Sequence, residues 1–374
     1  MAAKPGGPGL YLGMMSGTSL DGVDAALVET DGERLGACGR VLTLPVPPRL
    51  RATLRAIMDE AAGLALDDPA VRAAEAALTS LHAEAVRALL ARDGVAAAEV
   101  AAIGFHGQTV LHRPEARRTW QIGDGPELAA ATGIAVVHDF RSADVAAGGQ
   151  GAPFVPLFHA ALLAGSPRPV AALNLGGVAN LTWLGAKGEI LAFDTGPANA
   201  MLDDWALTHT GRPIDEGGAL AASGSVDADV LARLMAHPYF AAPPPKSLDR
   251  LDFHRAARAA GLDALLPADG AATLVAFTAG AVAAAVPHLP APPTGWIACG
   301  GGRHNPALMA SLRAALGVAV TTAEDAGWDG DAIEAQAFGF LAARSIRGLP
   351  LSLPETTGVP RPMPGGRLAV PKAA

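Results

Sequence analysis

The sequence predicts an α/β protein made of two related halves that face a common cleft. Short apolar runs typical of strands alternate with longer segments whose apolar residues recur at spacings of three and four, as in helices. A glycine-turned hairpin opens the chain over residues 10–28, and a similar hairpin follows over residues 170–184. The chain has 374 residues, which is more than a single domain usually contains. The repeated opening therefore predicts two domains of related organisation.

The first half begins with two strands joined by a polar turn, and its longest helix follows them. Val71, Leu78 and Leu89 have the spacing of one helix face, with Pro69 at the first turn and Gly94 at the end. Polar residues after a short buried strand are expected at its carboxyl end, where α/β sheets usually bind ligands. The expected elements are strands at 10–14, 25–28, 41–44, 100–105 and 134–137, helices at 50–63 and 69–94, and polar stretches at 106–109 and 120–125.

The second half repeats the hairpin and then alternates helices with strands. An alanine-rich segment at 271–286 predicts a packed core helix, and a proline-rich segment at 238–247 predicts an ordered loop or a lid hinge. The tail after Gly348 is rich in proline and glycine, which favours irregular structure on the surface. The expected elements are strands at 170–174, 178–184, 189–193, 296–299 and 318–321, and helices at 200–210, 271–286, 305–316 and 331–347.

The bulk composition argues against several classes of protein. Half of the residues are hydrophobic and 17% are charged, which is typical of a soluble globular protein. A net charge of −8 without a cluster of Lys or Arg argues against a nucleic-acid partner. Cys38 and Cys299 show no paired spacing, which excludes a disulfide framework and a cysteine-rich zinc site. We expect a cytoplasmic protein, because no signal pattern opens the chain and the segment at 271–286 is too short to span a bilayer.

The turn within residues 13–24 is the first candidate ligand site. Gly17 and Gly22 let the backbone approach a ligand, and the neighbouring hydroxyls and N–H groups could surround phosphate oxygens. It is not a Walker A loop, because no Gly-Lys-Ser/Thr follows. A hairpin that is simply rich in turn residues explains the same sequence about equally well.

Three further places carry chemistry, and each has a structural alternative. The glycines Gly300–Gly302, between a strand and a helix, would let a nucleotide approach the backbone, but a tight turn explains them as well. Asp194 ends an apolar strand, where it would face the cleft as a catalytic carboxylate or else cap the following helix. Glu334 is a second candidate carboxylate, although Asp331 and Glu334 have the spacing of a capping box. A lone histidine such as His106 is more often structural than a ligand, and no HExxH or GxSxG motif is present.

Nine stretches match, in order, the motifs of one family. They are Gly13–Asp24, Gly104–Thr109 (GFHGQT), Gln121–Asp124, Val137–Asp144 (VHDFRSAD), Asn174–Thr182 (NLGGVANLT), Phe193–Asn199 (FDTGPAN), Pro244–Ser247, Cys299–Asn305 (CGGGRHN) and Asp331–Leu341. With these motifs the sequence resembles the anhydro-N-acetylmuramic acid kinase family, within the actin/hexokinase-like ATPase superfamily. Phe105 and Ala198 depart from the family pattern, and neither removes a charged or hydroxyl group that the chemistry needs.

The resemblance implies a two-domain actin/hexokinase-like (ASKHA) fold, in which each domain is a mixed sheet flanked by helices. It places an N-terminal domain at 1–135, with the sugar side and the first phosphate hairpin, and a C-terminal ATP-binding domain at 136–346. A tail at 347–374 would pack back on the first domain. The resemblance further implies ATP in the interdomain cleft with Mg²⁺, a small-molecule amino-sugar substrate, and no nucleic-acid or membrane partner; it allows a homodimer.

By the same resemblance, the site residues fall into groups with different roles. Asp194 would be the catalytic base, and Glu334 would help to orient the water or the sugar. Asp21 would contribute to the Mg²⁺ site. The sugar would be bound by His106, Gln108, Thr109 and Asp124. The nucleotide would be held by Gly17, Thr18, Ser19, Leu20, Asp21, Gly22, Val23, Asp24, Asn174, Gly176, Gly177, Gly300, Gly301 and Gly302.

The reaction of this family opens the anhydro ring of 1,6-anhydro-N-acetylmuramic acid with water and phosphorylates O6 from ATP. The product is N-acetylmuramic acid 6-phosphate, an intermediate of cell-wall recycling. O6 is an ether oxygen without a proton, so the base would act on the water that attacks the anomeric carbon. Two alternatives stay open: a conventional amino-sugar or hexose kinase on the same fold, and a non-catalytic ATP-dependent sensor or scaffold.

Overall fold

The computed structural model describes residues 8–17, 19–65, 67–248 and 250–371, and the chain divides into two compact units. Unit 1 comprises Met1–Leu162 and Ala332–Ala374, and unit 2 comprises Leu163–Asp331. These limits differ from the sequence-based boundaries, which divided the chain after residue 135 and gave the long helix at 331–347 to the second domain. That helix belongs to unit 1 because it packs against the sheet of unit 1, a contact that local sequence patterns do not encode.

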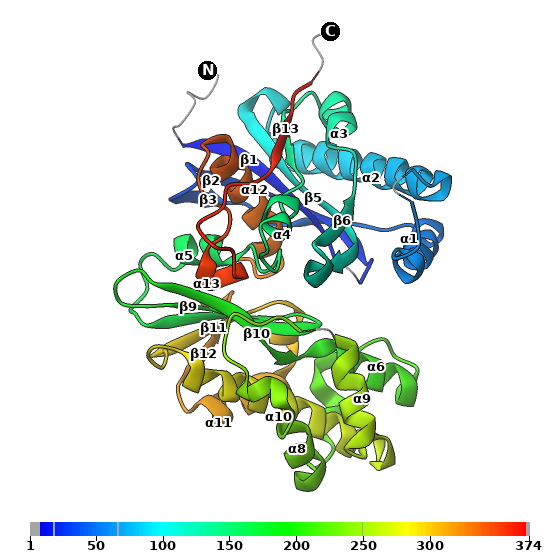
Figure 1. Ribbon diagram of the computed structural model, residues 1–374, viewed down its shortest axis with the longest axis vertical. Helices are drawn as coiled ribbons and strands as arrows, with labels where there is room; N and C mark the ends of the chain where they lie inside the picture. The colour runs from blue at the N-terminus through cyan, green and yellow to red at the C-terminus, as the bar shows by residue number, and fades with distance from the viewer. Residues whose placement is uncertain (1–7, 18, 66, 249, 372–374) are drawn as a thin grey trace. The chain divides into compact units, whose positions relative to one another are not determined.

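Unit 1 is built on one mixed sheet (Figure 1). Its strands are β1 (Gly9–Ser16), β2 (Gly22–Thr30), β3 (Leu35–Cys38), β4 (Leu42–Pro45), β5 (Val100–Arg113), β6 (Arg118–Ile122), β7 (Val136–His138) and β13 (Arg367–Ala369). The order is β13-β7-β5-β1-β2-β3, with β4 paired to β2 and β6 paired to β5. The pairs β3–β2 and β2–β1 are antiparallel, whereas β1–β5 and β5–β7 are parallel. The end of the chain joins this sheet, because β13 pairs with β7.

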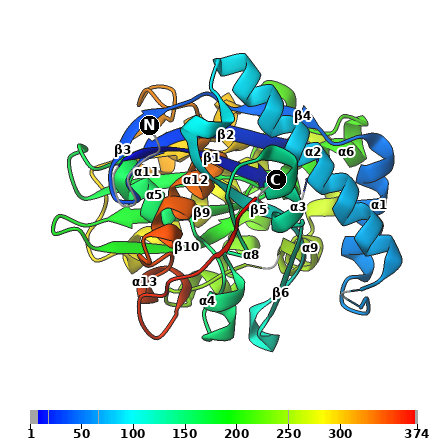
Figure 2. The ribbon, with the colours of Figure 1, turned by 90° about the horizontal axis from the view of Figure 1, so that it is seen from above.

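Helices cover both faces of this sheet. They are α1 (Pro48–Glu60), α2 (Pro69–Asp93), α3 (Gly125–Thr132), α4 (Ser142–Ala146), α5 (Pro156–Leu162), α12 (Ile333–Ile346) and α13 (Pro354–Thr357). Figure 2 shows α2 alongside α1 and α3. Side chains alternate along β1: Leu12 and Met14 point into the core shared with α1 and α2, and Gly13 lies on the other face, against α12.

The helix α12 lies unusually close to the centre of the sheet. A Cβ added at Gly13 would lie 1.7 Å from the carbonyl oxygen of Ala335, and one added at Gly104 would lie 1.9 Å from that of Phe338. Glycine at both positions is therefore what allows the helix backbone to rest directly on β1 and β5. This contact fixes the position of the first turn of α12, which carries Glu334.

Unit 2 repeats the organisation of unit 1. Its strands are β8 (Val170–Leu175), β9 (Val178–Leu184), β10 (Ile190–Pro197), β11 (Gly295–Cys299) and β12 (Ala319–Thr322), in the order β10-β9-β8-β11-β12. Two antiparallel pairs, β10–β9 and β9–β8, are followed by two parallel pairs, β8–β11 and β11–β12. The same series runs through β3-β2-β1-β5-β7 in unit 1. The predicted α/β class, with two related mixed sheets, is confirmed.

The helices of unit 2 include one that is long and apolar. They are α6 (Asn199–Thr210), α7 (Ala219–Ala222), α8 (Ala228–Met235), α9 (Arg250–Ala259), α10 (Pro267–Ala285) and α11 (Pro306–Leu316). With the turn that follows it, α10 spans Pro267–His288, 22 residues, so by length and composition alone it could cross a membrane. The segment that the sequence pattern marked as apolar, residues 271–286, is shorter than this helix and was expected to be too short to span a bilayer. The helix packs in the core of unit 2, with 67% of its apolar window buried, as core helices of soluble proteins do.

Most predicted elements are present, and one difference bears on the site. The strand β5 runs on to Arg113, through the residues His106–Thr109 that were expected after its end. These residues continue the strand because they pair with β6, Gln108 opposite Ile122 and Thr109 opposite Gln121. The sequence patterns also missed β3, β6, β13, α3, α4, α5, α7, α8, α9 and α13, most of which are short.

Candidate active site

Asp194 lies within β10, where the loop around Lys246 holds it. The N–H of Asp194 donates to the carbonyl oxygen of Lys246 (3.1 Å), and the carboxylate Oδ2 accepts a hydrogen bond from the N–H of Leu248 (2.9 Å). The hydroxyl of Tyr239 donates to the carbonyl oxygen of Asp194 (2.6 Å). Asp194 does not cap the next helix, because α6 begins after Ala198. Three hydrogen bonds thus fix a carboxylate that has no role in helix capping.

Lys246 stiffens the loop that holds Asp194. Its ammonium group donates to the carbonyl oxygen of Tyr239 (3.0 Å) and lies 4.7 Å from the centroid of the Tyr239 ring. Burial lowers the pKa of Lys246. The proline-rich segment is therefore an ordered loop, and its sequence matters because it positions Asp194.

The environment of Asp194 suits a general base. Burial raises the pKa of its carboxyl to about 7, and the hydrogen bond from Leu248 opposes that rise. Water reaches part of the side chain, which is half-buried, so it can exchange protons. A general base works best when its pKa lies near the operating pH. Asp194 meets that condition, whereas an ordinary solvated aspartate does not.

Two predicted nucleotide-binding segments meet at one edge of the unit 2 sheet. The parallel strands β8 and β11 place Asn174 opposite Cys299, so the turns that follow them are neighbours. Gly300 has a φ of +74°, and a Cβ there would lie 2.4 Å from Oδ1 of Asn174. A Cβ on Gly302 would lie 2.7 Å from the Cβ of Leu175. The glycines are therefore required for this close approach, and the turn is more than a generic tight turn.

The start of α6 completes this group. The side-chain amide of Asn199 donates to the carbonyl oxygen of Leu175 (2.8 Å), and its N–H donates to the carbonyl oxygen of Gly176 (3.0 Å). The backbone N–H of Ala200 donates to the carbonyl oxygen of Gly177 (3.2 Å). Asn199 thus holds the hairpin turn against the helix N-terminus, a place that favours anions. Asn199 was not among the predicted site residues, although it ends the matching stretch FDTGPAN.

The opening turn of unit 1 is a loop, not a tight two-residue turn. The last pair of the β1–β2 ladder joins Ser16 to Val23, which leaves residues 17–22 between them. Leu20 is fully buried and has a φ of +60°, so its side chain anchors the loop in the core despite a strained backbone. Val23 is also fully buried, so it and Leu20 offer a ligand only backbone groups. Thr18 lies outside the residues that the structure describes.

The acidic residues of this loop differ in their surroundings. Asp21 is exposed, and its carbonyl oxygen accepts hydrogen bonds from the N–H of Val46 (3.1 Å) and from Nη2 of Arg51 (3.3 Å). Asp24 accepts a hydrogen bond from the hydroxyl of Thr43 (2.6 Å). The described parts of the chain contain no group of three His, Cys, Asp or Glu that could hold a metal ion. Mg²⁺ in kinases usually takes one or two carboxylates together with phosphates, so the lone carboxylate of Asp21 fits that kind of site.

Glu334 lies in the first turn of α12 with its side chain exposed. The helix begins after Ala332 without a side-chain cap, so the capping-box alternative for Asp331 and Glu334 is wrong. Desolvation by the surrounding protein raises the pKa of Glu334, Arg141 opposes this rise, and Asp24 adds to it. Glu334 is therefore a solvated carboxylate whose position is set by the packing of α12 on the sheet.

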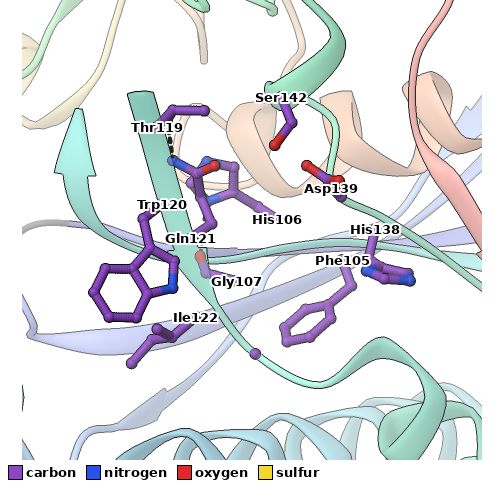
Figure 3. A pocket seen from close by; sticks show the side chains of 11 residues that line it. Phe105, His106, Gly107, Thr119, Trp120, Gln121, Ile122, His138, Asp139 and Ser142 are labelled. Atoms are coloured by element: carbon purple, nitrogen blue, oxygen red, sulfur yellow. Dashed lines mark hydrogen bonds between the residues drawn. The ribbon is translucent and has the colours of Figure 1, made fainter. Parts of the chain in front are cut away.

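A pocket of about 370 Å³ lies in unit 1 beside β5 and β6 (Figure 3). Figure 3 shows Trp120 and Gln121 of β6 on one side of it and His138 and Asp139 on another. Aromatic rings combined with polar groups, in a pocket of this size, suit a small polar ligand. The lining residues are Phe105, His106, Gly107, Thr119, Trp120, Gln121, Ile122, Gly123, His138, Asp139 and Ser142.

His106 is buried in the wall of this pocket, and both of its ring nitrogens are engaged. Nε of Arg141 donates to Nε2 of His106 (2.9 Å), which must therefore be unprotonated. The proton then lies on Nδ1, which donates to the carbonyl oxygen of Gly107 (2.7 Å). Burial holds the pKa of His106 well below its usual value, and the charge of Arg141 lowers it further. His106 is thus a neutral ring, held in one tautomer, and not an acid–base catalyst.

The other three predicted sugar ligands do not line the pocket. Gln108 is fully buried in β5, and its Oε1 has no hydrogen-bond partner among the described residues. Thr109 accepts a hydrogen bond from Nε2 of Gln121 (3.2 Å), so it supports a side chain that does line the pocket. Asp124 is exposed and caps α3 by accepting a backbone hydrogen bond (2.9 Å).

Arg141 and Asp139 received no role from the sequence. Asp139 lines the pocket, and Arg141 lies behind it, in contact with His106. Nη1 of Arg141 donates to the carbonyl oxygen of Gly151 (2.5 Å), and its guanidinium lies 5.4 Å from the centroid of the Phe154 ring. Burial lowers the pKa of Arg141 to about 10, so it stays charged near neutral pH. Asp139 has a φ of +54°, a strained conformation of the kind that clusters at functional sites. Both belong to the matching stretch VHDFRSAD, and this stretch was the sequence feature that could have identified them as site residues.

The family model and the similar sequences point to one family. Residues 9–369 match the family described as "Anhydro-N-acetylmuramic acid kinase". A protein of that name from Acidiphilium cryptum (strain JF-5) is 59% identical, over 97% of this chain and 99% of its own. Another from Gluconobacter oxydans (strain 621H) is 58% identical, over 95% of this chain and 98% of its own. Among solved structures, component A of (R)-2-hydroxyglutaryl-CoA dehydratase from Acidaminococcus fermentans covers 90% of this chain and 99% of its own, at 11% identity and a TM-score of 0.48.

Proposed function

The chain belongs to the anhydro-N-acetylmuramic acid kinase family, and we propose that it performs the reaction of that family. Water opens the anhydro ring of 1,6-anhydro-N-acetylmuramic acid, and O6 receives the γ-phosphoryl group of ATP. The products are N-acetylmuramic acid 6-phosphate and ADP, in cytoplasmic cell-wall recycling. The observation that carries the proposal, besides the family itself, is the fixed carboxylate of Asp194 with its pKa raised to about 7.

The chemistry requires a base for water and not for the sugar. O6 is an ether oxygen, so it has no proton to lose. Asp194 takes a proton from the water that attacks the anomeric carbon C1, and the C1–O6 bond breaks. O6 forms its bond to the γ-phosphorus as the bond from that phosphorus to the bridging oxygen breaks and ADP leaves. The hydrogen bond from Leu248 occupies Oδ2 of Asp194, which leaves Oδ1 to face the water. Transfer to phosphorus replaces the general acid that ordinarily protonates such a leaving group.

The nucleotide is placed on two glycine-rich groups. In unit 2, the hairpin Asn174–Gly177 faces the phosphates and the turn Gly300–Gly302 lies beside the adenosine. In unit 1, the backbone of residues 17–24 supplies further donors for the phosphates. Mg²⁺, when bound with ATP, neutralises the charge on the transferring phosphoryl group, and Asp21 is the residue that would contribute to holding it.

The sugar is placed on unit 1, beside the pocket that His106 lines. Trp120 offers a ring face and Gln121 and Asp139 offer polar groups, as sugar sites commonly do. Glu334, from α12, orients the water or the sugar. With this function, the partner is a small-molecule substrate, and we expect neither a membrane nor a nucleic-acid partner. Assembly into a homodimer stays a prediction.

One measurement tests this function against its alternatives. The protein is incubated with ATP and either anhydro-N-acetylmuramic acid or reducing amino sugars and hexoses, and products are identified by mass spectrometry. We expect N-acetylmuramic acid 6-phosphate from the anhydro sugar. Phosphorylation of reducing sugars alone would indicate a conventional sugar kinase. No turnover with any sugar would indicate a sensor or scaffold.

The pH dependence of the reaction should report Asp194. Because its pKa is raised to about 7, the carboxyl is protonated, and useless as a base, at lower pH. We therefore expect kcat/KM to fall about tenfold per pH unit below this value and to level off above it, measured with Mg²⁺ in excess. A decline in kcat/KM centred on the ordinary pKa of aspartate would contradict the assignment of Asp194 as the base.

The opening loop can be tested at Gly17. A Cβ there would meet nothing closer than the hydroxyl of Ser19 at 3.6 Å, so the fold should tolerate a larger side chain. Gly17→Val should nevertheless weaken ATP binding by about tenfold or more, because the side chain would occupy the space of the phosphates. Calorimetric titration with ATP checks this, and the KM of the sugar should change far less. Unchanged ATP affinity in the folded variant would remove this loop from the phosphate site.

A further inference from the structure

Arg303 follows the glycine turn of unit 2, and its side chain is almost completely buried. The side chain is 2% exposed, although it belongs to a short helical turn in which an arginine would ordinarily reach into solvent. Nη1 donates to the carbonyl oxygen of Gly300 (3.0 Å) and to Oδ1 of Asp331 (2.8 Å). Nη2 and Nε bind the carboxylate of Glu324 at 2.7 and 3.0 Å. One side chain thus joins the turn to two acidic residues far along the chain.

The surrounding residues are shaped for this guanidinium. A Cβ on Gly330 would lie 2.5 Å from Nε of Arg303, so glycine is required there for the segment to pack on it. The N–H of Gly330 also donates to Oε1 of Glu324 (3.2 Å). The hydrogen bonds from Arg303, and after them its charge, lower the pKa of Glu324 to about 2 and lower that of Asp331 as well, so both stay ionised around neutral pH. The fork geometry with Glu324 is one that lysine cannot reproduce.

The glycine turn has little of its own to keep it in place. Inside it, the N–H of Arg303 donates to the carbonyl oxygen of Gly300 (3.2 Å), and the N–H of Asn305 donates to that of Gly302 (3.0 Å). Gly300–Gly302 have no side chains to pack, and glycine loses more conformational freedom on ordering than any other residue. An anchor on Gly300 therefore lowers the entropy that a nucleotide must supply when it binds there.

We propose that Arg303 is a positioning residue for the nucleotide: it holds Gly300–Gly302 in the binding conformation by clamping the turn to Glu324 and Asp331. The inference rests on the proposed placement of the nucleotide at this turn. Asp331 is the last residue of unit 2, directly before Ala332 and α12 in the chain. The clamp therefore also connects the nucleotide turn to the segment that leads into the helix carrying Glu334.

Loss of the Arg303 interactions should affect the glycine turn more than the stability of the fold. Glu324 and Asp331 have side chains that are 48% and 58% exposed, so both carboxylates stay hydrated when the arginine is lost. Arg303→Lys keeps a positive charge between them but cannot reach Gly300, Glu324 and Asp331 together. The matched control is Arg258→Lys, also in unit 2, because Arg258 forms an exposed ion pair with Asp263 (3.5 Å).

The test is calorimetric titration of the full-length protein with ADP, together with the KM values of both substrates. We expect Arg303→Lys to weaken ADP binding and to raise the KM of ATP by about tenfold, with the KM of the sugar within about twofold of wild type. Arg258→Lys should leave all three unchanged. If Arg303→Lys does not fold, Glu324→Gln replaces it. The amide keeps the size of the carboxylate but loses the negative charge that pairs with Arg303. A smaller loss of ADP affinity is then expected.

The possible outcomes distinguish the positioning role of Arg303 from the placement of the nucleotide on which it rests. Wild-type protein that binds ADP, with Arg303→Lys or Glu324→Gln binding it equally well, would overturn the clamp alone. An equal rise in the KM values of ATP and of the sugar, with a lower melting temperature, would also overturn it, since that pattern marks a purely structural residue. Wild-type protein that does not bind ADP would overturn the placement of the nucleotide and with it the proposed function.

Discussion

Asp194→Asn should lower kcat by about 10²–10⁴-fold while ADP affinity stays within about threefold of wild type. Asparagine keeps the size of the side chain and an oxygen that can accept the hydrogen bond from Leu248, so the loop should hold its place. What is lost is the group that takes the proton from water. Steady-state kinetics and calorimetric titration with ADP measure the two effects. Near-normal turnover would rule Asp194 out as the base.

The stability of the same variant separates loss of the base from loss of the fold. The pKa of Asp194 is raised from 3.8 to about 7, so ionisation of this group disfavours the folded state increasingly as the pH rises between these values. Asp194→Asn should therefore be more stable than wild type at pH 8, by roughly 1–3 kcal/mol after allowance for partial exposure. The gain should shrink toward pH 4. Asp204→Asn, a partly exposed change on α6 at a carboxylate that lies 3.4 Å from His254, is the control; it should change stability by less than about 1 kcal/mol and leave kcat unchanged.

Gly104→Ala should destabilise unit 1 by about 3 kcal/mol or more, because the added Cβ meets backbone atoms that cannot rotate away. It would lie 1.9 Å from the carbonyl oxygen of Phe338 and 2.4 Å from the carbon of that carbonyl. Relief requires α12 to move off the sheet, which displaces Glu334 at its first turn. Calorimetry should therefore show a lower melting temperature, and any folded fraction should have a lower kcat.

The matched control for this change is Gly295→Ala. Gly295 also lies in a sheet strand, β11, but a Cβ there meets nothing closer than the carbonyl oxygen of Ala319 at 4.0 Å. The stability of the Gly295→Ala variant should be equal to that of wild type or slightly higher, since alanine restricts the unfolded chain more than glycine does. If Gly104→Ala behaved like Gly295→Ala, the close contact of α12 with the sheet would not be a determinant of stability.

Local patterns in the sequence were sufficient to predict the elements with a clear period or boundary. The hairpins, the helix ending at Gly94 and the return of the opening hairpin in the second unit follow from alternation and from glycine placement. The end of β5 could not be placed, because polar residues such as Gln108 and Thr109 continue the strand only through pairing with β6. The assignment of α12 to unit 1 depends on contact with Gly13 and Gly104, which are distant in sequence.

The candidate site was predictable where a motif surrounds a residue and not elsewhere. Asp194 stands between an apolar strand and Thr-Gly-Pro, so its place could be inferred, but its pKa depends on the distant Leu248 and on burial. Arg141 and Arg303 were missed, because an arginine in a loop resembles a solvated surface residue until its partners are seen. His106 was expected to bind the sugar directly, and its contact with Arg141 could not be read from the chain.

In the proposed mechanism, ring opening and phosphoryl transfer are one event, with Asp194 activating the water. The direct measurement is the reaction in ¹⁸O-water, with early sampling and an unlabelled-product control, because reducing sugars exchange their anomeric oxygen slowly. We expect the label in the anomeric hydroxyl and not in the phosphate, and we expect the anhydro sugar to stay intact with an ATP analogue whose γ-group cannot be transferred. Label in the phosphoryl group, or ring opening without ATP, would contradict the account.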